Sequence, residues 1–197
     1  MSAVRIVVLA SGSGTLFQAL IDNQDHLNIE IVALVVDKDV PAIERAHKHG
    51  ISVIEVPINS DRGEWDLVMH QVLTDLHPEF VVSAGFMRIL GPNTVRGFLG
   101  RLINTHPALL PNFPGAHAVR DALAAGVQET GCTVHFVDEG VDTGPVISQR
   151  VVQIDANDTE SSLHERIKIQ ERELLVETLH KLVDGTIRYH DGKVVTA

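Results

Sequence analysis

One stretch of the sequence places two polar side chains that can do acid–base chemistry close together. Residues 101–115 read RLINTHPALLPNFPG, with Asn104 and His106 at the end of an apolar run. A histidine can accept or donate a proton near neutral pH, and an asparagine amide can donate a hydrogen bond to a developing oxyanion. In an extended chain both side chains project to the same side. The pair alone does not establish catalysis, because a turn cap at Asn104 and a carbonyl contact at His106 also account for it.

Three prolines follow this pair, at Pro107, Pro111 and Pro114. A proline ring fixes its own φ angle, and Pro107 also biases His106 towards an extended backbone. We therefore expect this stretch to be rigid and to hold the two polar side chains in place.

A carboxylate comes from a later stretch, FVDEGVDTGPVI, at residues 136–147. The apolar run TVHFV leads into an acidic loop that contains Asp138, Glu139 and Asp142 and ends in Thr-Gly-Pro. Glycine and proline constrain such a turn before the next strand, expected at residues 146–152. A carboxylate close to a histidine raises its basicity and fixes its orientation. A solvated surface turn is the alternative.

The chain alternates β-branched runs with helical spacing, which predicts an α/β fold. Continuously apolar runs, typical of buried parallel strands, occupy residues 4–10, 29–36, 52–56 and 80–84. Helical spacing occupies residues 16–21, 41–49, 62–76 and 159–184, and a hairpin through Asp191-Gly192 is expected near the end. This order predicts right-handed crossovers and one doubly wound, mostly parallel sheet flanked by helices. Ligands bind beyond the carboxyl ends of such strands, where a strand at residues 101–103 would deliver Asn104 and His106.

The first strand-end loop is ASGSGTLFQ, residues 10–18. Gly12 and Gly14 allow backbone N–H groups to approach an anion at the start of the next helix, where the helix dipole favours negative charge. We interpret this loop as a phosphate site without a lysine. It is not the dinucleotide fingerprint, which needs a third glycine where Phe17 stands, and it lacks the lysine of a P-loop. A tight turn with no ligand is the alternative.

A second strand-end loop is AGFMRIL, residues 84–90. Its apolar residues and Arg88 could line a slot for a flat heterocycle. Periodicity alone favours a different interpretation, in which Phe86, Met87 and Ile89 pack into the core.

Composition sets the class of protein. The 197 residues are 44% hydrophobic and fit one compact domain. The formal charge of -10 disfavours binding to nucleic acid, which depends on many cations. The single cysteine, Cys132, excludes an internal disulfide, fits a reducing compartment, and lies in a predicted strand where it is no candidate nucleophile. No apolar run has the length of a membrane span, and residues 1–10 do not form a signal peptide. We expect a cytoplasmic enzyme or binding protein.

Taken together, SGSG, AGFMRIL, INTHPALLPNFPG, TVHFVDEGVDTGPVI and QERELL occur in the order seen in one enzyme family. Over essentially its whole length the sequence resembles the phosphoribosylglycinamide formyltransferases. The resemblance implies a single formyltransferase domain over residues 1–197, with a phosphate-binding Rossmann-like half (1–100) and a catalytic and folate-binding half (101–197). It implies small-molecule substrates, no nucleic-acid or membrane partner, and a monomer or homodimer.

The reaction that the resemblance implies is formyl transfer in purine biosynthesis. The donor is 10-formyltetrahydrofolate, and the acceptor is the amine of glycinamide ribonucleotide. The amine attacks directly and gives a tetrahedral oxyanion, with no metal ion and no covalent enzyme intermediate.

The resemblance also assigns roles to residues. The catalytic residues are Asn104, His106 and Asp142. The folate is bound by Arg62, Met87, Arg88, Ile89, Leu90, Asn104, Asp138 and Val141. The ribonucleotide is bound by Gly12, Ser13, Gly14, Thr15, Leu16 and Glu171. Two positions depart from the family pattern: Leu16, where bacterial members often have asparagine, and Val119, where some members have histidine.

Other functions are compatible with parts of the sequence. Methionyl-tRNA formyltransferases share the catalytic motif but are longer, with a tRNA-binding domain, and formyltetrahydrofolate hydrolases usually carry an N-terminal regulatory domain. A dinucleotide-binding module could use Gly12, Gly14 and Asp37, although it lacks the third glycine. A metal hydrolase could use His47 and His49, but residues two apart on a predicted helix point to different sides.

Overall fold

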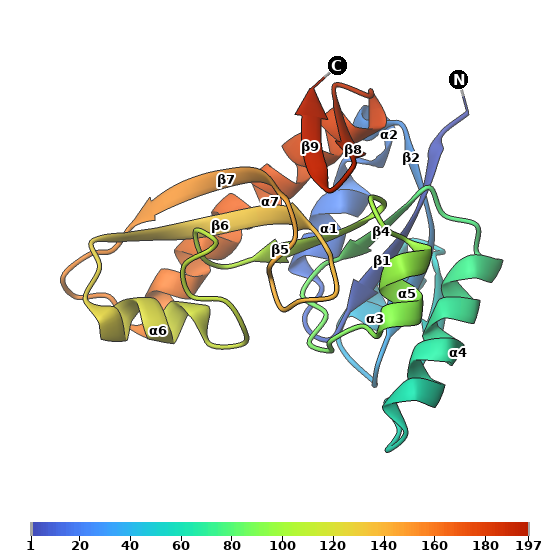
Figure 1. Ribbon diagram of the computed structural model, residues 1–197, viewed down its shortest axis with the longest axis horizontal. Helices are drawn as coiled ribbons and strands as arrows, with labels where there is room; N and C mark the ends of the chain where they lie inside the picture. The colour runs from blue at the N-terminus through green and yellow to red at the C-terminus, as the bar shows by residue number, and fades with distance from the viewer. Residues whose placement is uncertain (1, 197) are drawn as a thin grey trace.

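A seven-stranded sheet runs through the molecule (Figure 1), in a computed structural model that describes residues 2–196. The strand order is β3-β2-β1-β4-β5-β6-β7. All pairs from β3 to β5 are parallel, whereas β6 is antiparallel to both β5 and β7. The expected doubly wound, mostly parallel sheet is therefore confirmed. The strands are β1 (Val4–Ala10), β2 (Ile29–Val36), β3 (Ser52–Glu55), β4 (Phe80–Ser83), β5 (Leu102–His106), β6 (Glu129–Phe136) and β7 (Val146–Gln153).

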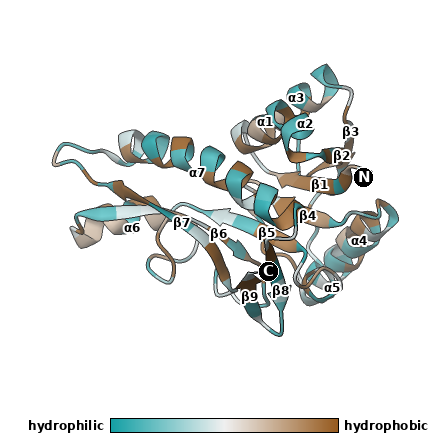
Figure 2. Cartoon of the chain, turned by 90° about the horizontal axis from the view of Figure 1, so that it is seen from above, coloured by the Kyte–Doolittle hydropathy of each residue, from teal (hydrophilic) through white to brown (hydrophobic). Residues whose placement is uncertain are grey.

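Helices cover both faces of the sheet. Figure 2 shows α1, α2, α3 and α7 on one side of β1 and β4, with α4 and α5 on the other. The helices are α1 (Thr15–Asp22), α2 (Gln24–Leu27), α3 (Ala42–Lys48), α4 (Arg62–Asp75), α5 (Pro92–Gly97), α6 (Ala118–Ala125) and α7 (Glu160–Val183). The short helices α2, α5 and α6 were not expected from the sequence. Helices α2 and α5, with four and six residues, are too short to show an apolar period, whereas α6 has eight residues, as many as α1. None of the helices in the described part of the chain has the length and apolar character needed to cross a membrane.

The central strand β1 explains why the apolar runs are continuous. Ile6 and Val8 pack into the apolar cluster under α1 and α7, whereas Val7 and Leu9 pack into the cluster under α4 and α5. Each of these side chains is fully buried, which contributes roughly 1.5–3 kcal/mol per residue. A strand with a core on each face needs apolar residues at every position.

The long C-terminal helix packs against its own sheet, as expected. Contacts from α7 reach β6, β7 and α1, and Leu163, Ile167 and Leu175 are fully buried. Its start is fixed by Thr159, whose side chain accepts a hydrogen bond from the Ser162 N–H in a capping box. The expected hairpin also forms, from β8 (Ile187–His190) and β9 (Lys193–Thr196), with positive φ at Asp191 and Gly192.

Strand β5 is longer than expected and ends at His106 instead of residue 103. Asn104 and His106 therefore belong to the strand itself.

The connection into β5 is anchored by Asp66 of α4, a buried carboxylate at the start of α5. Asp66 accepts hydrogen bonds from the Asn93 and Thr94 N–H groups and from both of their side chains. Burial alone would raise the pKa of Asp66, but these hydrogen bonds outweigh it and lower the pKa.

We predict that Asp66→Ala lowers the free energy of unfolding by about 3 kcal/mol, because it leaves several buried donors without an acceptor. Urea denaturation at pH 7 measures the change. The control is Asp75→Ala on the same helix, where the exposed carboxylate accepts only from Gln71 and the change should stay below about 0.5 kcal/mol. Equal losses in the two variants would contradict this role of Asp66.

Candidate active site

The polar residues of β5 meet a histidine on the neighbouring strand. Asn104 pairs with His135 in the antiparallel β5–β6 register, and the Asn104 Nδ2 atom lies 3.2 Å from His135 Nε2. His135 Nδ1 lies 2.8 Å from the Phe136 carbonyl oxygen. That carbonyl favours the proton on Nδ1, so in the neutral ring Nε2 accepts a hydrogen bond from the Asn104 amide. One N–H of the Asn104 amide is thereby used, and the second is available to a ligand.

Asp142 completes the cluster. Its Oδ2 atom lies 3.3 Å from His106 Nδ1, and its Oδ1 atom lies 3.6 Å from His135 Nε2. The Gly115 N–H also donates to Oδ2, at 2.8 Å. Burial alone would raise the pKa of Asp142, but the contact with His135, the Gly115 N–H and the nearby histidine charges lower it. The three residues singled out in the sequence thus lie together, with a carboxylate held ionised between two histidines.

Both nitrogens of the His106 ring face acceptors. Nδ1 faces the Asp142 carboxylate, and Nε2 lies 2.8 Å from the Phe113 carbonyl oxygen. Such surroundings accommodate an N–H at each ring position, as in the imidazolium. Phe113 has a φ of 53°, a left-handed conformation that is uncommon for a bulky residue. Before His106 can donate a hydrogen bond from Nε2 to a ligand, its hydrogen bond to the Phe113 carbonyl oxygen must break.

The segment after His106 is held by hydrogen bonds as well as by its prolines. The buried Thr133 hydroxyl of β6 donates to the Ala108 carbonyl at 2.6 Å and accepts from the Leu110 N–H at 3.1 Å. Gln149 of β7 donates to the Leu110 carbonyl at 2.8 Å. The segment is therefore fixed to the antiparallel edge of the sheet, a support that proline content alone does not reveal.

The glycine loop faces α7 across a cavity of about 160 Å³. His164, Lys168 and Glu171 of α7 follow one another at helical spacing and line this cavity. The glycine loop itself contains no lysine, but Lys168, from the far end of the sequence, lines the same cavity. The other lining residues are Gly12, Ser13, Gly14, Thr15, Leu16, Ala84, Gly85, Met87, Thr105 and Pro107, the last two on either side of His106.

Glu171 is a buried carboxyl group at the wall of this cavity, with 5% of its surface exposed. Burial raises the pKa of Glu171 to about 7, against smaller opposing effects of the Thr105 side chain and the charges of Lys168 and Arg172. Near neutral pH this group can exist in either protonation state, which suits a side chain that meets an amine or a hydroxyl group.

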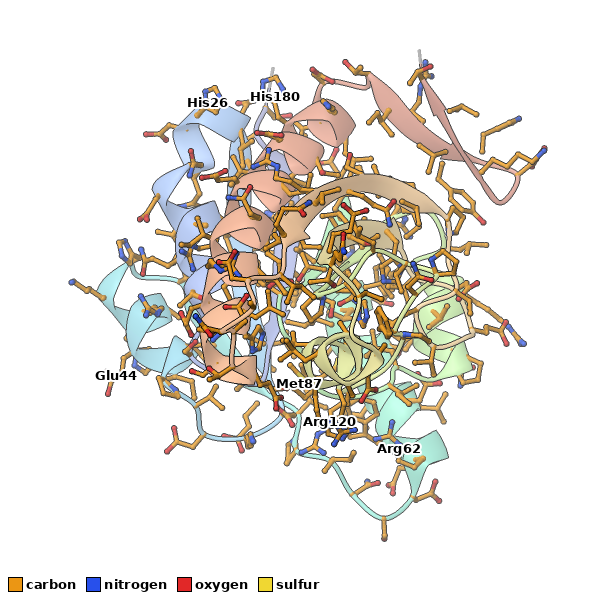
Figure 3. The ribbon with its side chains drawn as sticks, turned by 90° about the vertical axis from the view of Figure 1, so that its left-hand side faces the viewer. His26, Glu44, Arg62, Met87, Arg120 and His180 are labelled. Atoms are coloured by element: carbon orange, nitrogen blue, oxygen red, sulfur yellow. The ribbon has the colours of Figure 1, made fainter. Side chains whose placement is uncertain are left out.

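The loop at residues 84–90 exposes apolar side chains. Met87 is 71% exposed and Ile89 is 64% exposed, so the interpretation that both pack into the core is wrong, whereas Phe86 is buried. The Met87 N–H donates to the Ser11 hydroxyl at 2.9 Å, which ties this loop to the glycine loop. Arg62 donates to the Ile89 carbonyl. Figure 3 shows Met87 near the N-terminal end of α7 and Arg62 farther along the same edge of the molecule.

Other expected folate contacts are placed less directly. The Arg88 side chain turns to the buried Asp37, with Nε 2.6 Å from Oδ2, so Arg88 offers its backbone to a ligand. Asp37, the residue that a dinucleotide-binding module would need, is thereby committed to an ion pair. Asp138 accepts from the Gly140 N–H and the Thr143 hydroxyl within its own loop. Leu90 packs on the cluster under α4, and Val141 is exposed.

The two departures from the family pattern are core side chains. Leu16 and Val119 are both buried in apolar clusters, Leu16 under α1 and Val119 beneath α6.

The remaining candidates are not part of the polar cluster around Asp142. His47 and His49 are exposed at the end of α3, and Cys132 is buried in β6, where burial raises the pKa of its thiol to about 12. Within residues 2–196, no group of three or more histidine, cysteine or acidic side chains could hold a metal ion.

His135 and Lys168 are absent from the residues to which the sequence points. A histidine inside the apolar run before the acidic loop was a visible signal for His135. Lys168 carried a weaker one, three residues before Glu171 on the same helical face.

The formyl transferase family matches residues 4–179 of the chain, so the chain is a member of that family and its fold is that of a formyltransferase. The phosphoribosylglycinamide formyltransferase of Mycobacterium tuberculosis is 49% identical over 175 residues, which are 87% of this chain and 81% of that protein. The chain therefore belongs to the phosphoribosylglycinamide formyltransferase family, whose members are folate-dependent enzymes of purine biosynthesis.

Solved structures agree with this assignment. Glycinamide ribonucleotide transformylase 1 from Symbiobacterium toebii superposes with a TM-score of 0.94 at 34% identity, covering 99% of this chain and 94% of that one. A formyltetrahydrofolate deformylase from Pseudomonas syringae superposes with a TM-score of 0.92 at 26% identity, covering 98% of this chain but 66% of that one. The same fold thus occurs in enzymes whose names specify different reactions.

We predict that Glu171→Gln makes the protein more stable at pH 8. Because the pKa of Glu171 is raised on folding, ionising this group opposes folding, and wild-type stability falls as pH rises from about 4.5 to 7. The variant should gain about 3 kcal/mol in free energy of unfolding above pH 7 and nothing below pH 4.5.

Urea denaturation at pH 4.5 and pH 8 measures this difference. The control is Glu160→Gln at the exposed start of the same helix, which removes a charge near the helix N-terminus and should lower stability by no more than about 1 kcal/mol at pH 8, with no gain at either pH. A Glu171→Gln protein with the same pH dependence as the wild type would refute the prediction.

Proposed function

We propose that the enzyme transfers the formyl group of 10-formyltetrahydrofolate to the amine of glycinamide ribonucleotide, with Asn104, His106 and Asp142 as its catalytic residues. One observation carries the proposal. His106 and Asp142 are paired at the carboxyl edge of the sheet with Asn104 on the same strand, and Thr105 and Pro107, the neighbours of His106, line the glycine-loop cavity together with Met87 of the loop at residues 84–90. Two different substrates can therefore approach one set of polar groups.

The loop at residues 84–90 fits the folate donor. Exposed Met87 and Ile89 offer apolar contact to a flat heterocycle, and the backbone of Arg88 offers a donor and an acceptor. Arg62 supplies a positive charge beside Ile89, suited to an anionic glutamyl tail. The bound folate supplies an activated formyl group on N10. Leu90, Asp138 and Val141 complete the proposed folate contacts.

The glycine loop and α7 fit the acceptor. Backbone N–H groups of the loop and the Lys168 side chain line a space suited to a phosphate, and the Lys168 ammonium, 2.8 Å from Glu165 Oε1, can exchange that carboxylate for the ligand. Glu171 lies on the same helical face as Lys168, where an ionised carboxylate can attract the amine end. The acceptor cavity takes residues from both proposed halves of the domain, residues 1–100 and residues 101–197.

The chain's own residues stabilise the transfer. When the amine forms its bond to the formyl carbon, the negative charge that develops on the formyl oxygen receives a hydrogen bond from the free N–H of Asn104. His106, as the cation, adds a second donor or a nearby positive charge. Asp142 holds this cation and relays a proton from the attacking nitrogen to N10, whose bond to the formyl carbon then breaks. The buried Cys132 thiol, with its raised pKa, takes no part.

A cytoplasmic location, a monomer or homodimer, and the absence of nucleic-acid and membrane partners remain expectations. They rest on the formal charge of -10, the single cysteine and the resemblance.

We predict that Asn104→Ala and His106→Ala each lower kcat by a factor of about 100 or more while the protein stays folded, because each removes a group that stabilises the oxyanion. Steady-state kinetics and circular dichroism measure the two effects. His117→Ala, at an exposed histidine on the next segment, is the control and should keep wild-type kcat. Near-wild-type turnover in both test variants would end the catalytic assignment.

We predict that glycinamide ribonucleotide is the acceptor when formyl transfer from 10-formyltetrahydrofolate is measured with three acceptors and no added metal. The other acceptors are water and charged initiator methionyl-tRNA. Transfer to water or to tRNA alone would leave the folate assignment standing and refute the acceptor cavity. No transfer to any acceptor would refute both.

A further inference from the structure

Helix α3 binds the carbonyl groups of the glycine loop. The Ala42 N–H, in the first turn of α3, donates to the Gly12 carbonyl at 3.2 Å. One turn later, Arg45 Nε donates to the Ser13 carbonyl at 2.8 Å. Two consecutive carbonyls of the loop are thus directed to the same helix. Figure 3 shows α3, marked by Glu44, beside α1, which it contacts.

These two bonds fix the direction of the N–H groups on the other side of the loop. In a trans peptide the carbonyl of one residue and the N–H of the next point in opposite directions. With the Gly12 and Ser13 carbonyls turned to α3, the N–H groups of Ser13 and Gly14 turn away from α3. Both residues line the 160 Å³ cavity opposite Lys168. Successive N–H groups of this kind form an anion-binding concavity.

Close packing leaves the loop little freedom to turn. Gly14 has a φ of 72°, and a Cβ atom there would lie 2.8 Å from Ala42 Cβ and 3.3 Å from Arg45 Cδ. The guanidinium of Arg45 is itself held from α1, where Nη1 donates to Gln18 Oε1 at 3.1 Å. Gln18 in turn donates to Asp22 at 2.8 Å. The Arg45 guanidinium is therefore held by hydrogen bonds to both the glycine loop and α1.

We propose that Arg45 is a positioning residue for the acceptor substrate: it aligns the Ser13 and Gly14 N–H groups with the acceptor's phosphate without touching it. This inference rests on the proposed function, in which the glycine loop holds that phosphate. Arg45 borders a separate groove between α1 and α7 and acts on the cavity through the backbone of the loop. Its loss weakens binding of the phosphate and leaves the folate loop and the catalytic cluster unchanged.

Steady-state kinetics of two variants tests this inference. Arg45→Met keeps the aliphatic stem that packs near Gly14 and removes both hydrogen bonds. It should raise KM for glycinamide ribonucleotide about tenfold, while kcat and KM for 10-formyltetrahydrofolate change less than twofold. Arg45→Lys keeps the charge but cannot span Ser13 and Gln18 together, so its KM should be intermediate. Lys48→Ala, an exposed cation on the same helix, is the charge-matched control and should behave as wild type.

A phosphate-free acceptor, glycinamide riboside, separates alignment from general damage. Wild type and Arg45→Met should have equal KM values for it, because the loop then has no phosphate to bind. An unchanged KM for the ribonucleotide in Arg45→Met, or an equal rise in KM for both acceptors, would overturn the role of Arg45 and leave the phosphate assignment of the loop standing. A wild-type enzyme that binds both acceptors equally would overturn the phosphate assignment of the loop, and the role of Arg45 with it.

Discussion

The polar cluster depends on one half-buried carboxylate that lies among histidines. Asp142 receives the Gly115 N–H and faces His106 and His135, so it joins the segment after β5, the strand β6 and the loop that follows β6. Burying an ionised group is costly unless it is hydrogen-bonded and paired, and each of these contacts offsets that cost. The positions of these segments are therefore coupled: the carboxylate is tolerated only where all of them meet, and they meet at the end of the strand that carries Asn104.

The parallel and the antiparallel parts of the sheet contribute different groups around this carboxylate. The parallel strands, with apolar residues on both faces, form a rigid layer whose carboxyl edge carries the glycine loop and the loop at residues 84–90. The antiparallel strands β6 and β7 add the groups that hold the segment after His106, through Thr133 and Gln149. Ser11 joins the glycine loop to the loop at residues 84–90, because its N–H donates to the Gly85 carbonyl and its hydroxyl accepts from the Met87 N–H. The two loops are thus hydrogen-bonded to each other at the start of the glycine loop.

The sequence predicts the features that local patterns determine. The bounds of β1 and β2, the long helix, the hairpin and the presence of Asn104, His106 and Asp142 at one edge all follow from periodicity, turn residues and family motifs. It does not predict His135, because only the antiparallel register places that side chain opposite Asn104. Nor does it predict Lys168, since the face that α7 turns to the glycine loop depends on how a long helix packs. Met87 and Ile89 are exposed although the periodicity favours their burial. A loop that binds a ligand, as we propose for this one, need not bury its apolar residues.

The walls of the cavity that we propose for the acceptor come from opposite ends of the chain. Gly14 follows the first strand, whereas Lys168 and Glu171 belong to the last helix. A contact between residues so far apart in sequence forms only after most of the chain has closed on itself. On the ribosome, a partly synthesised chain already contains the glycine loop but has no opposite wall. A ligand that needs both walls binds the completed fold selectively and stabilises it by mass action. The metabolite itself thus favours molecules whose synthesis and folding are complete.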